Sequence, residues 1–295
     1  MKLFKGSGVA LITPFENGEI NQTLFIQLIE WHIAKKTDAL IISGTTGESA
    51  TLSKEEKKRL FQTAVQISAG RVPIIANTGT NNTQESIELS IEAATLGVDG
   101  ILAVTPYYNK PTQRGMIEHF KAIANAVNIP IILYNVPSRT GVNLSQESVV
   151  ELSKIPNIIA VKEASGDLKQ VQAIIEGTAS DFAVYSGNDD LIFDILKLGG
   201  DGVISVVANI APFETHQLCA EFLIEKENAK LIQERLDILN NVLYCEPNPV
   251  PIKEALAQLG LSTREVRLPL TTMLEENRKQ LKEALNVYGL HEVVL

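Results

Sequence analysis

Short apolar runs rich in β-branched residues alternate along the chain with longer segments of helical periodicity. The runs that we predict to be strands are 9–12, 39–43, 73–77, 100–104, 130–135, 158–163, 182–186 and 202–206. Their starts lie roughly 20 to 35 residues apart, which is the size of one strand–helix unit. Strands that are apolar along nearly their whole length are typical of a parallel sheet covered on both faces. Such units within about 225 residues favour a (β/α)8 barrel over an open doubly wound sheet.

The segments between these runs carry signals for the start and the end of helices. Ser53 and Glu56 have the spacing of a capping box, and Asn21 can cap a second helix. The similar stretches 96–102 and 198–204 each hold a glycine suited to ending a helix, followed by an Asp-Gly turn. These signals predict helix-to-strand junctions where a barrel needs them.

The alternation of strands and helices stops after residue 224. Residues 225–295 show no strand pattern and predict helices, interrupted by the proline-rich stretch 246–251. Thr272 and Glu275 have capping-box spacing ahead of the last helix. We therefore expect a catalytic barrel over residues 1–224 and a small helical domain over residues 225–295.

Charge and composition exclude several classes of protein. The chain has 295 residues and a net charge of −9, which argues against a binder of nucleic acid or anionic membranes. An anionic small substrate remains possible, because it needs only one cationic pocket. No apolar stretch has the length of a membrane span or a signal peptide. Cys219 and Cys245 lack CxxC spacing, so we expect no disulfide framework and a cytoplasmic protein.

In a (β/α)8 barrel, the catalytic and binding residues lie just past the carboxyl ends of the strands. Hydroxyl groups, one arginine and one lysine follow the predicted strands at these ends. The four histidines contribute nothing there, because all fall in helix-like segments without the spacing of metal ligands. They are His32, His119, His216 and His291. We therefore expect no metal site.

Lys162 is the most informative of the strand-end residues. Alternation along 158–163 places its side chain on the same face as Ile158 and Ala160. If that face points into the barrel, burial lowers the pKa of the lysine and makes a neutral amine available for imine formation with a ketone. The alternative is a lysine whose amine reaches out to water.

Four further residues have both a chemical and an ordinary interpretation. Tyr134 ends a strand and could transfer protons, or it could be a core tyrosine with a satisfied hydroxyl. Thr45 and Thr46 lie in a glycine-bounded turn that could hold a carboxylate or be purely structural. Arg139 could clamp a carboxylate or extend into solvent.

A pair of tyrosines and a second lysine are the other residues of interest. Tyr107 and Tyr108 are adjacent, so their side chains diverge in an extended chain and serve different purposes. Lys253 is a rival to Lys162, but it lies outside the barrel pattern, where we expect it near the start of a helix.

The motifs together resemble the dihydrodipicolinate synthase/N-acetylneuraminate lyase family over essentially the whole chain. The motifs are GTTGE at 44–48, YNVPSRTG at 134–141 and VKEASGD at 161–167, in the order and spacing of the family. The resemblance implies a (β/α)8 barrel with a C-terminal helical domain, in agreement with the periodicity.

The resemblance also implies roles for residues that match the family's motifs. Lys162 would form the imine with pyruvate, and Tyr134 would donate and accept protons. Thr45 would relay protons between Tyr134 and Tyr108, the latter reaching across from a neighbouring subunit. No metal or organic cofactor would be needed, because the protonated imine is the electron sink.

Substrate contacts follow from the resemblance in the same way. Thr46 would bind the carboxylate of pyruvate, and Gly187 and the backbone of Ile204 would line the imine. Arg139 would hold the carboxylate of the incoming aldehyde.

Arg139 and the Thr45–Thr46 pair favour one branch of the family. Its members condense pyruvate with L-aspartate 4-semialdehyde, the first committed step of lysine and diaminopimelate synthesis. A sister aldolase acting on N-acetylneuraminate or a keto-deoxy sugar acid is the alternative, and a non-catalytic keto-acid sensor is a third possibility. The expected assembly is a homotetramer built as a dimer of dimers.

Members of the family that lysine inhibits bind it in a pocket at a subunit interface. The matching residues here are Ser49, Ala50, Asn81, Glu85 and Tyr107, together with Lys54 and Lys57. Strongly inhibited bacterial members usually have histidine at the last two positions. Two cations near a site for a cationic ligand should weaken binding, so we predict weak or absent feedback by L-lysine.

Overall fold

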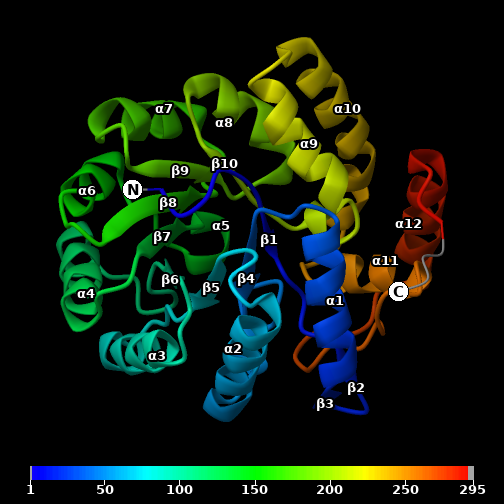
Figure 1. Ribbon diagram of the computed structural model, residues 1–295, viewed down its shortest axis with the longest axis horizontal. Helices are drawn as coiled ribbons and strands as arrows, with labels where there is room; N and C mark the ends of the chain where they lie inside the picture. The colour runs from blue at the N-terminus through cyan, green and yellow to red at the C-terminus, as the bar shows by residue number, and fades with distance from the viewer. Residues whose placement is uncertain (1, 292–295) are drawn as a thin grey trace.

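The computed structural model describes residues 2–291 and contains a closed barrel of parallel strands (Figure 1). Residue 1 and residues 292–295, the outer ends of the two predicted domains, lie outside the described residues. The barrel strands are β1 (Gly6–Ala10), β4 (Ala39–Ile42), β5 (Ile74–Asn77), β6 (Gly100–Val104), β7 (Ile131–Asn135), β8 (Ile158–Glu163), β9 (Ala183–Ser186) and β10 (Gly202–Ser205). Each strand pairs with its neighbour in sequence, and β10 closes the barrel against β1. The predicted (β/α)8 architecture is confirmed.

The first strand differs most from its prediction, because it begins at Gly6 instead of residue 9. Gly6 is paired with Gly202 in the parallel ladder. A Cβ atom on Gly202 would lie 1.9 Å from the carbonyl oxygen of Gly6, so the two backbones approach too closely for any side chain. Glycine contributes no apolar side chain to the hydrophobic pattern, so that pattern does not show where this strand begins.

Two apolar layers surround the strands. The inner layer fills the barrel and includes Phe4, whose ring stacks on Tyr185 at a centroid distance of 4.3 Å. The outer layer lies between the strands and the helices.

Strand β8 does not alternate in the way that we predicted. Ala160 lies in the inner layer, but Ile158 lies in the outer one. An irregularity in the pairing of β7 with β8 leaves Ile159 as an extra residue. The extra residue shifts the alternation, so that Ile158 points to the opposite face from the one predicted. Lys162 keeps the inward face because the irregularity precedes it.

Helices follow the strands, and all of those listed next except the short α5 cover the outside of the barrel (Figure 1). They are α1 (Gln22–Ala34), α2 (Lys54–Ser68), α3 (Thr83–Thr95), α4 (Gln113–Ala126), α5 (Pro137–Thr140), α6 (Gln146–Leu152), α7 (Leu168–Gly177), α8 (Ile192–Leu198) and α9 (Pro212–Phe222). Asn21 caps α1, and Ser53 and Glu56 form the predicted capping box of α2. Gly97 and Gly199 adopt positive φ after α3 and α8, as the two similar stretches predicted.

The described residues after α9 contain the helices α10 (Lys226–Leu243), α11 (Val250–Gln258) and α12 (Glu275–Tyr288) and no strand. The predicted capping box of Thr272 and Glu275 is wrong. Helix α12 begins at Glu275, and its N-cap residue Leu274 makes no side-chain cap. The backbone N–H of Leu274 instead donates to Glu246 Oε1 at 2.9 Å. A carboxylate from a distant segment thus replaces the local cap.

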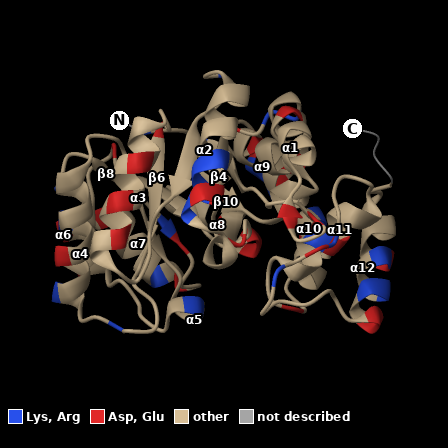
Figure 2. Ribbon diagram, turned by 90° about the horizontal axis from the view of Figure 1, so that it is seen from below, with Lys and Arg blue, Asp and Glu red and all other residues tan. Residues whose placement is uncertain are grey.

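A short hairpin of β2 (Phe15–Glu16) and β3 (Glu19–Ile20) precedes α1 and was not predicted, since two-residue strands carry no periodicity. Within residues 2–291, no helix is both long and apolar enough to cross a membrane. Acidic and basic residues are interspersed on outer helices such as α12 (Figure 2).

Candidate active site

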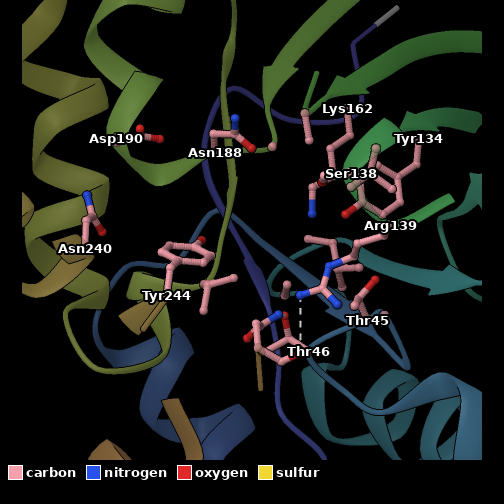
Figure 3. A pocket seen from close by; sticks show the side chains of 18 of the residues that line it. Thr45, Thr46, Tyr134, Ser138, Arg139, Lys162, Asn188, Asp190, Asn240 and Tyr244 are labelled. Atoms are coloured by element: carbon pink, nitrogen blue, oxygen red, sulfur yellow. Dashed lines mark hydrogen bonds between the residues drawn. The ribbon is translucent and has the colours of Figure 1, made fainter. Parts of the chain in front are cut away.

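A cavity of about 510 Å³ opens at the carboxyl ends of the barrel strands. The polar residues that line it are Thr45, Thr46, Tyr134, Ser138, Arg139, Lys162, Asn188, Asp190, Asn240, Asn241, Tyr244, Cys245 and Asn248. In Figure 3, Lys162, Tyr134, Arg139 and the two threonines lie on one side, opposite Asp190, Asn240 and Tyr244. The predicted strand-end residues therefore converge on one cavity, which helix α10 closes from the other side.

Lys162 and Tyr134 are register partners on the neighbouring strands β8 and β7. Partners in a parallel ladder point to the same face, so both side chains project into the barrel mouth. The Nζ atom of Lys162 lies 4.4 Å from the centroid of the Tyr134 ring. Lys162 is 5% exposed, and within the described residues its Nζ forms no hydrogen bond or salt bridge. The amine is thus shielded from bulk water and can contact a ligand in the cavity.

Thr45 and Thr46 lie in the turn between β4 and the short helix η1 (Ser49–Thr51), and both line the cavity. The hydroxyl of Thr46 accepts a hydrogen bond of 3.0 Å from Nδ2 of Asn248. The carbonyl oxygen of Asn248 in turn accepts one of 3.3 Å from Nη2 of Arg139. Asn248 therefore joins the hydroxyl and the guanidinium that we expect to hold carboxylates.

Arg139 lies in the short helix α5, and its guanidinium is directed into the cavity (Figure 3). Glycine is required at position 187, because a Cβ atom there would lie 2.6 Å from Cβ of Ala164 and 3.2 Å from Cε of Lys162. Gly187 therefore leaves room beside the amine. Ile204, which we expected to line the imine, is fully buried in the inner layer of the barrel and is not among the residues that line the cavity.

The buried carboxylate of Asp189 accepts hydrogen bonds from groups next to the cavity. Oδ2 of Asp189 accepts hydrogen bonds from the backbone N–H groups of Val206 (3.0 Å) and Val207 (2.9 Å) and from the Tyr244 hydroxyl (3.2 Å). Burial raises the pKa of Asp189, while the Ser205 hydroxyl, the two backbone N–H groups and the charge of Lys162 act in the opposite direction. Burial and the Asp189 charge raise the pKa of Tyr244. The Tyr244 hydroxyl is therefore a neutral donor at neutral pH.

The two adjacent tyrosines have different surroundings. Tyr108 is 89% exposed, adopts a left-handed φ of 70° and does not line the cavity of its own chain. Tyr107 is 39% exposed and faces a second cavity of about 490 Å³. Of the residues predicted for a lysine pocket, this second cavity is lined by Ser49, Ala50, Lys57, Glu85 and Tyr107.

Two residues predicted for that pocket do not line the second cavity. Lys54 forms an exposed ion pair with Glu88 at 3.5 Å, and Asn81 is not among the lining residues. Burial and the charge of Lys54 lower the pKa of Lys57, whereas Glu85 raises it. The cations at 54 and 57 thus already repel each other without a ligand.

The histidines lie away from both cavities. His32 in α1 and His119 in α4 are buried, and burial lowers their pKa values to about 3 and about 4. His216 contacts Asp38 at 2.9 Å, and His291 follows α12 rather than lying within a helix. Among the described residues, no group of three or more His, Cys, Asp or Glu side chains could hold a metal ion.

The sequence did not single out five further residues that line the cavity, namely Asn188, Asp190, Asn240, Tyr244 and Asn248. Asn188 and Asp190 directly follow strand β9, so their position at a strand end was a usable signal. Asn240 and Tyr244 come from α10, and only the packing of that helix over the barrel brings them to the cavity.

Fold and cavity together define a (β/α)8-barrel protein with a buried lysine in its mouth. Residues 3–288 match the model of the dihydrodipicolinate synthetase family, and the chain belongs to this family. A 4-hydroxy-tetrahydrodipicolinate synthase of Caldicellulosiruptor saccharolyticus is 51% identical over 293 residues, which cover 99% of each chain. The crystal structure of dihydrodipicolinate synthase from Aquifex aeolicus is 44% identical, with a TM-score of 0.96 over 99% of this chain and 100% of that one. A monomeric dihydrodipicolinate synthase variant is 40% identical, with a TM-score of 0.96 over 98% of both chains.

Proposed function

We propose that this chain is a 4-hydroxy-tetrahydrodipicolinate synthase, a lyase that condenses pyruvate with L-aspartate 4-semialdehyde. The observation that carries the proposal is the enclosed Lys162 amine beside the Tyr134 ring at the mouth of the barrel. The close relatives of that name and the family's dependence on pyruvate without an external cofactor support it. The reaction belongs to lysine and diaminopimelate synthesis, and a cytoplasmic location goes with that role.

The first half of the reaction prepares pyruvate as a carbon nucleophile. Nζ of Lys162 attacks the keto carbon, and loss of water leaves an iminium ion. Tyr134 gives its proton to the departing hydroxyl as water leaves. The iminium then withdraws electrons from the neighbouring methyl group, which loses a proton to the phenolate oxygen of Tyr134. Thr46 holds the carboxylate of pyruvate, and Gly187 leaves space for the imine beside Lys162. No metal is needed, because the iminium is the electron sink.

The second half forms the carbon–carbon bond and releases the enzyme. The enamine carbon attacks the aldehyde carbon, whose oxygen takes up a proton, while Arg139 holds the aldehyde's carboxylate. The amino group of the product then attacks the imine carbon, which closes the ring and frees the amine of Lys162. Thr45 passes protons between Tyr134 and a second tyrosine.

The second tyrosine is Tyr108 of a neighbouring copy. At 89% exposure, its side chain is available to enter the cavity of another chain but not its own. Such an exchange makes the dimer the smallest complete catalytic unit, and a homotetramer would contain two such dimers. The lining of the second cavity by Tyr107 from the same loop supports an interface there.

The test is a turnover assay with pyruvate and L-aspartate 4-semialdehyde, coupled to excess dihydrodipicolinate reductase and followed by loss of NADPH. We expect pyruvate-dependent oxidation that disappears in Lys162→Ala, whereas a keto-acid sensor would retain its affinity for pyruvate in that variant. A folded wild type that oxidises no NADPH would refute the proposal. Cleavage of N-acetylneuraminate or a keto-deoxy sugar acid by the same preparation would favour a sister aldolase.

A further inference from the structure

The turn that carries Thr45 and Thr46 ends at a residue in an unusual backbone conformation. Glu48 adopts a φ of 55° and a ψ of 38°, in the left-handed region that side-chain-bearing residues avoid. Its backbone N–H donates to the carbonyl oxygen of Thr45 at 3.0 Å, and its own carbonyl accepts from Thr51. The position of Thr45 therefore depends on whatever keeps Glu48 in this conformation.

The side chain of Glu48 is held by the C-terminal part of the chain. Its Oε1 accepts a hydrogen bond of 2.5 Å from Nζ of Lys253 in α11, and its Oε2 accepts one of 2.9 Å from the backbone N–H of Arg267. Both side chains of the ion pair are shielded from water, with exposures of 0% for Lys253 and 1% for Glu48. The pair thus bridges the barrel turn and a helix that is 205 residues away in sequence.

Further contacts keep Lys253 in place. Its Nζ also donates to the carbonyl oxygen of Glu265 at 2.6 Å and lies 4.2 Å from the centroid of the Phe15 ring. Burial lowers the pKa of Lys253, and the Glu48 carboxylate opposes that shift. The amine has no access to either cavity, which removes Lys253 as a rival nucleophile.

A second cation from the same segment holds the far end of this stretch. The guanidinium of Arg267 binds both carboxylate oxygens of Glu56 at 2.6 and 2.9 Å and donates to the carbonyl oxygen of Thr51 at 3.1 Å. It packs on the Phe15 ring at 4.3 Å. The backbone between Glu48 and Glu56 is thus anchored at both ends by residues of the C-terminal segment.

We propose that Lys253 and Glu48 form a positioning pair that holds Thr45 and Thr46 in register with Tyr134 and Lys162. The pair touches no substrate, and its role rests on the proposed function, in which Thr45 relays protons and Thr46 binds pyruvate. Without the pair, the turn relaxes out of its left-handed conformation and the relay hydroxyl moves away from Tyr134. Displacement of a catalytic group by about 1 Å is enough to slow a reaction on the order of 100-fold.

The test separates imine formation from proton transfer. Borohydride reduction in the presence of pyruvate traps the imine on Lys162, and mass spectrometry measures it. Exchange of the pyruvate methyl protons with D2O, followed by NMR without aldehyde, measures proton removal. In Lys253→Met we expect trapping to persist while exchange and kcat fall on the order of 10- to 100-fold. All rates are compared below the unfolding transition of each variant.

The control variant is Lys2→Met. It removes the cation of another short ion pair, between Nζ of Lys2 and Oδ1 of Asp201 at 2.5 Å, at the opposite end of the barrel. We expect it to lower thermal stability and leave exchange and kcat within about two-fold of the wild type, because that end holds no catalytic group. A role in stability alone would make the two variants behave alike.

A double variant decides the matter if Lys253→Met does not fold. Glu48→Gln/Lys253→Met leaves no unpaired buried charge, so its thermal stability should recover. A positioning role predicts that proton exchange remains slow in this protein. Recovery of exchange together with stability, or exchange within two-fold of the wild type in the folded single variant, would overturn the proposal. A wild type that traps no pyruvate would instead refute the proposed function.

Discussion

The buried histidines predict how the protein responds to acid. His32 is fully buried in α1, and its Nδ1 lies 3.0 Å from the Thr37 hydroxyl, while Nε2 has no hydrogen-bond partner among residues 2–291. Burial lowers its pKa to about 3. In the unfolded chain, a histidine titrates near about 6.5. The folded state therefore binds fewer protons than the unfolded state between these values, and stability falls as the pH falls through this window.

The magnitude follows from the two pKa values. A pH of 5 is about 1.5 units below the pKa of the unfolded histidine, which is therefore protonated, whereas the folded histidine is still neutral. At about 1.4 kcal/mol per pH unit, His32 alone removes about 2 kcal/mol of stability between pH 8 and pH 5. His119, with its pKa lowered to about 4, contributes a similar amount by the same reasoning. The two together should remove about 4 kcal/mol.

The assay is urea denaturation, followed by circular dichroism at several pH values from 8 to 5. The variant His32→Gln keeps a hydrogen-bonding group for Thr37 but cannot titrate, so its loss of stability over this range should be about 2 kcal/mol smaller. Thr37→Val is the matched control, because it removes the hydrogen bond and keeps the titrating ring. An unchanged pH slope in His32→Gln would refute the reasoning.

Three further predictions follow from the site and the fold. Arg139→Ala should lower kcat/KM for the aldehyde by about 10- to 100-fold, because a charged hydrogen bond is worth about 1.5–3 kcal/mol. Borohydride trapping of pyruvate should persist in this variant, and loss of trapping would contradict the assigned role. L-Lysine should inhibit weakly, because Lys57 lines the second cavity and Lys54 lies close enough to perturb it; an inhibition constant well below millimolar would contradict this. Ser53→Ala should cost about 1 kcal/mol in urea denaturation through loss of the α2 capping box, with kcat unchanged.

Local patterns were sufficient wherever a single element carries the signal. The alternation of apolar runs and helical segments located every barrel strand, and the caps at Asn21 and Ser53 are those of the structure. They succeed because a strand buried on both faces must be apolar along its length, and a helix start must satisfy its own N–H groups. The same logic failed at Leu274, where a carboxylate from residue 246 supplied the cap.

The candidate site divides in the same way. Lys162, Tyr134 and Arg139 were identifiable because strand ends in a barrel converge at one face. Alternation correctly places Lys162 on the face of Ala160, but it does not reveal the irregularity that turns Ile158 to the other face. The lining by Asn240 and Tyr244 depends on how α10 packs over the barrel mouth.

The sequence by itself determined the barrel, its helical extension and the strand ends where chemistry gathers, because these follow from periodicity and from the residue types at each end. Only the tertiary structure decided which distant groups hold the reactive ones in place. Thr46 meets Asn248 across 202 residues, and Glu48 meets Lys253 across 205. No local preference encodes such contacts, since they exist only after the barrel has closed and the C-terminal segment has packed against it.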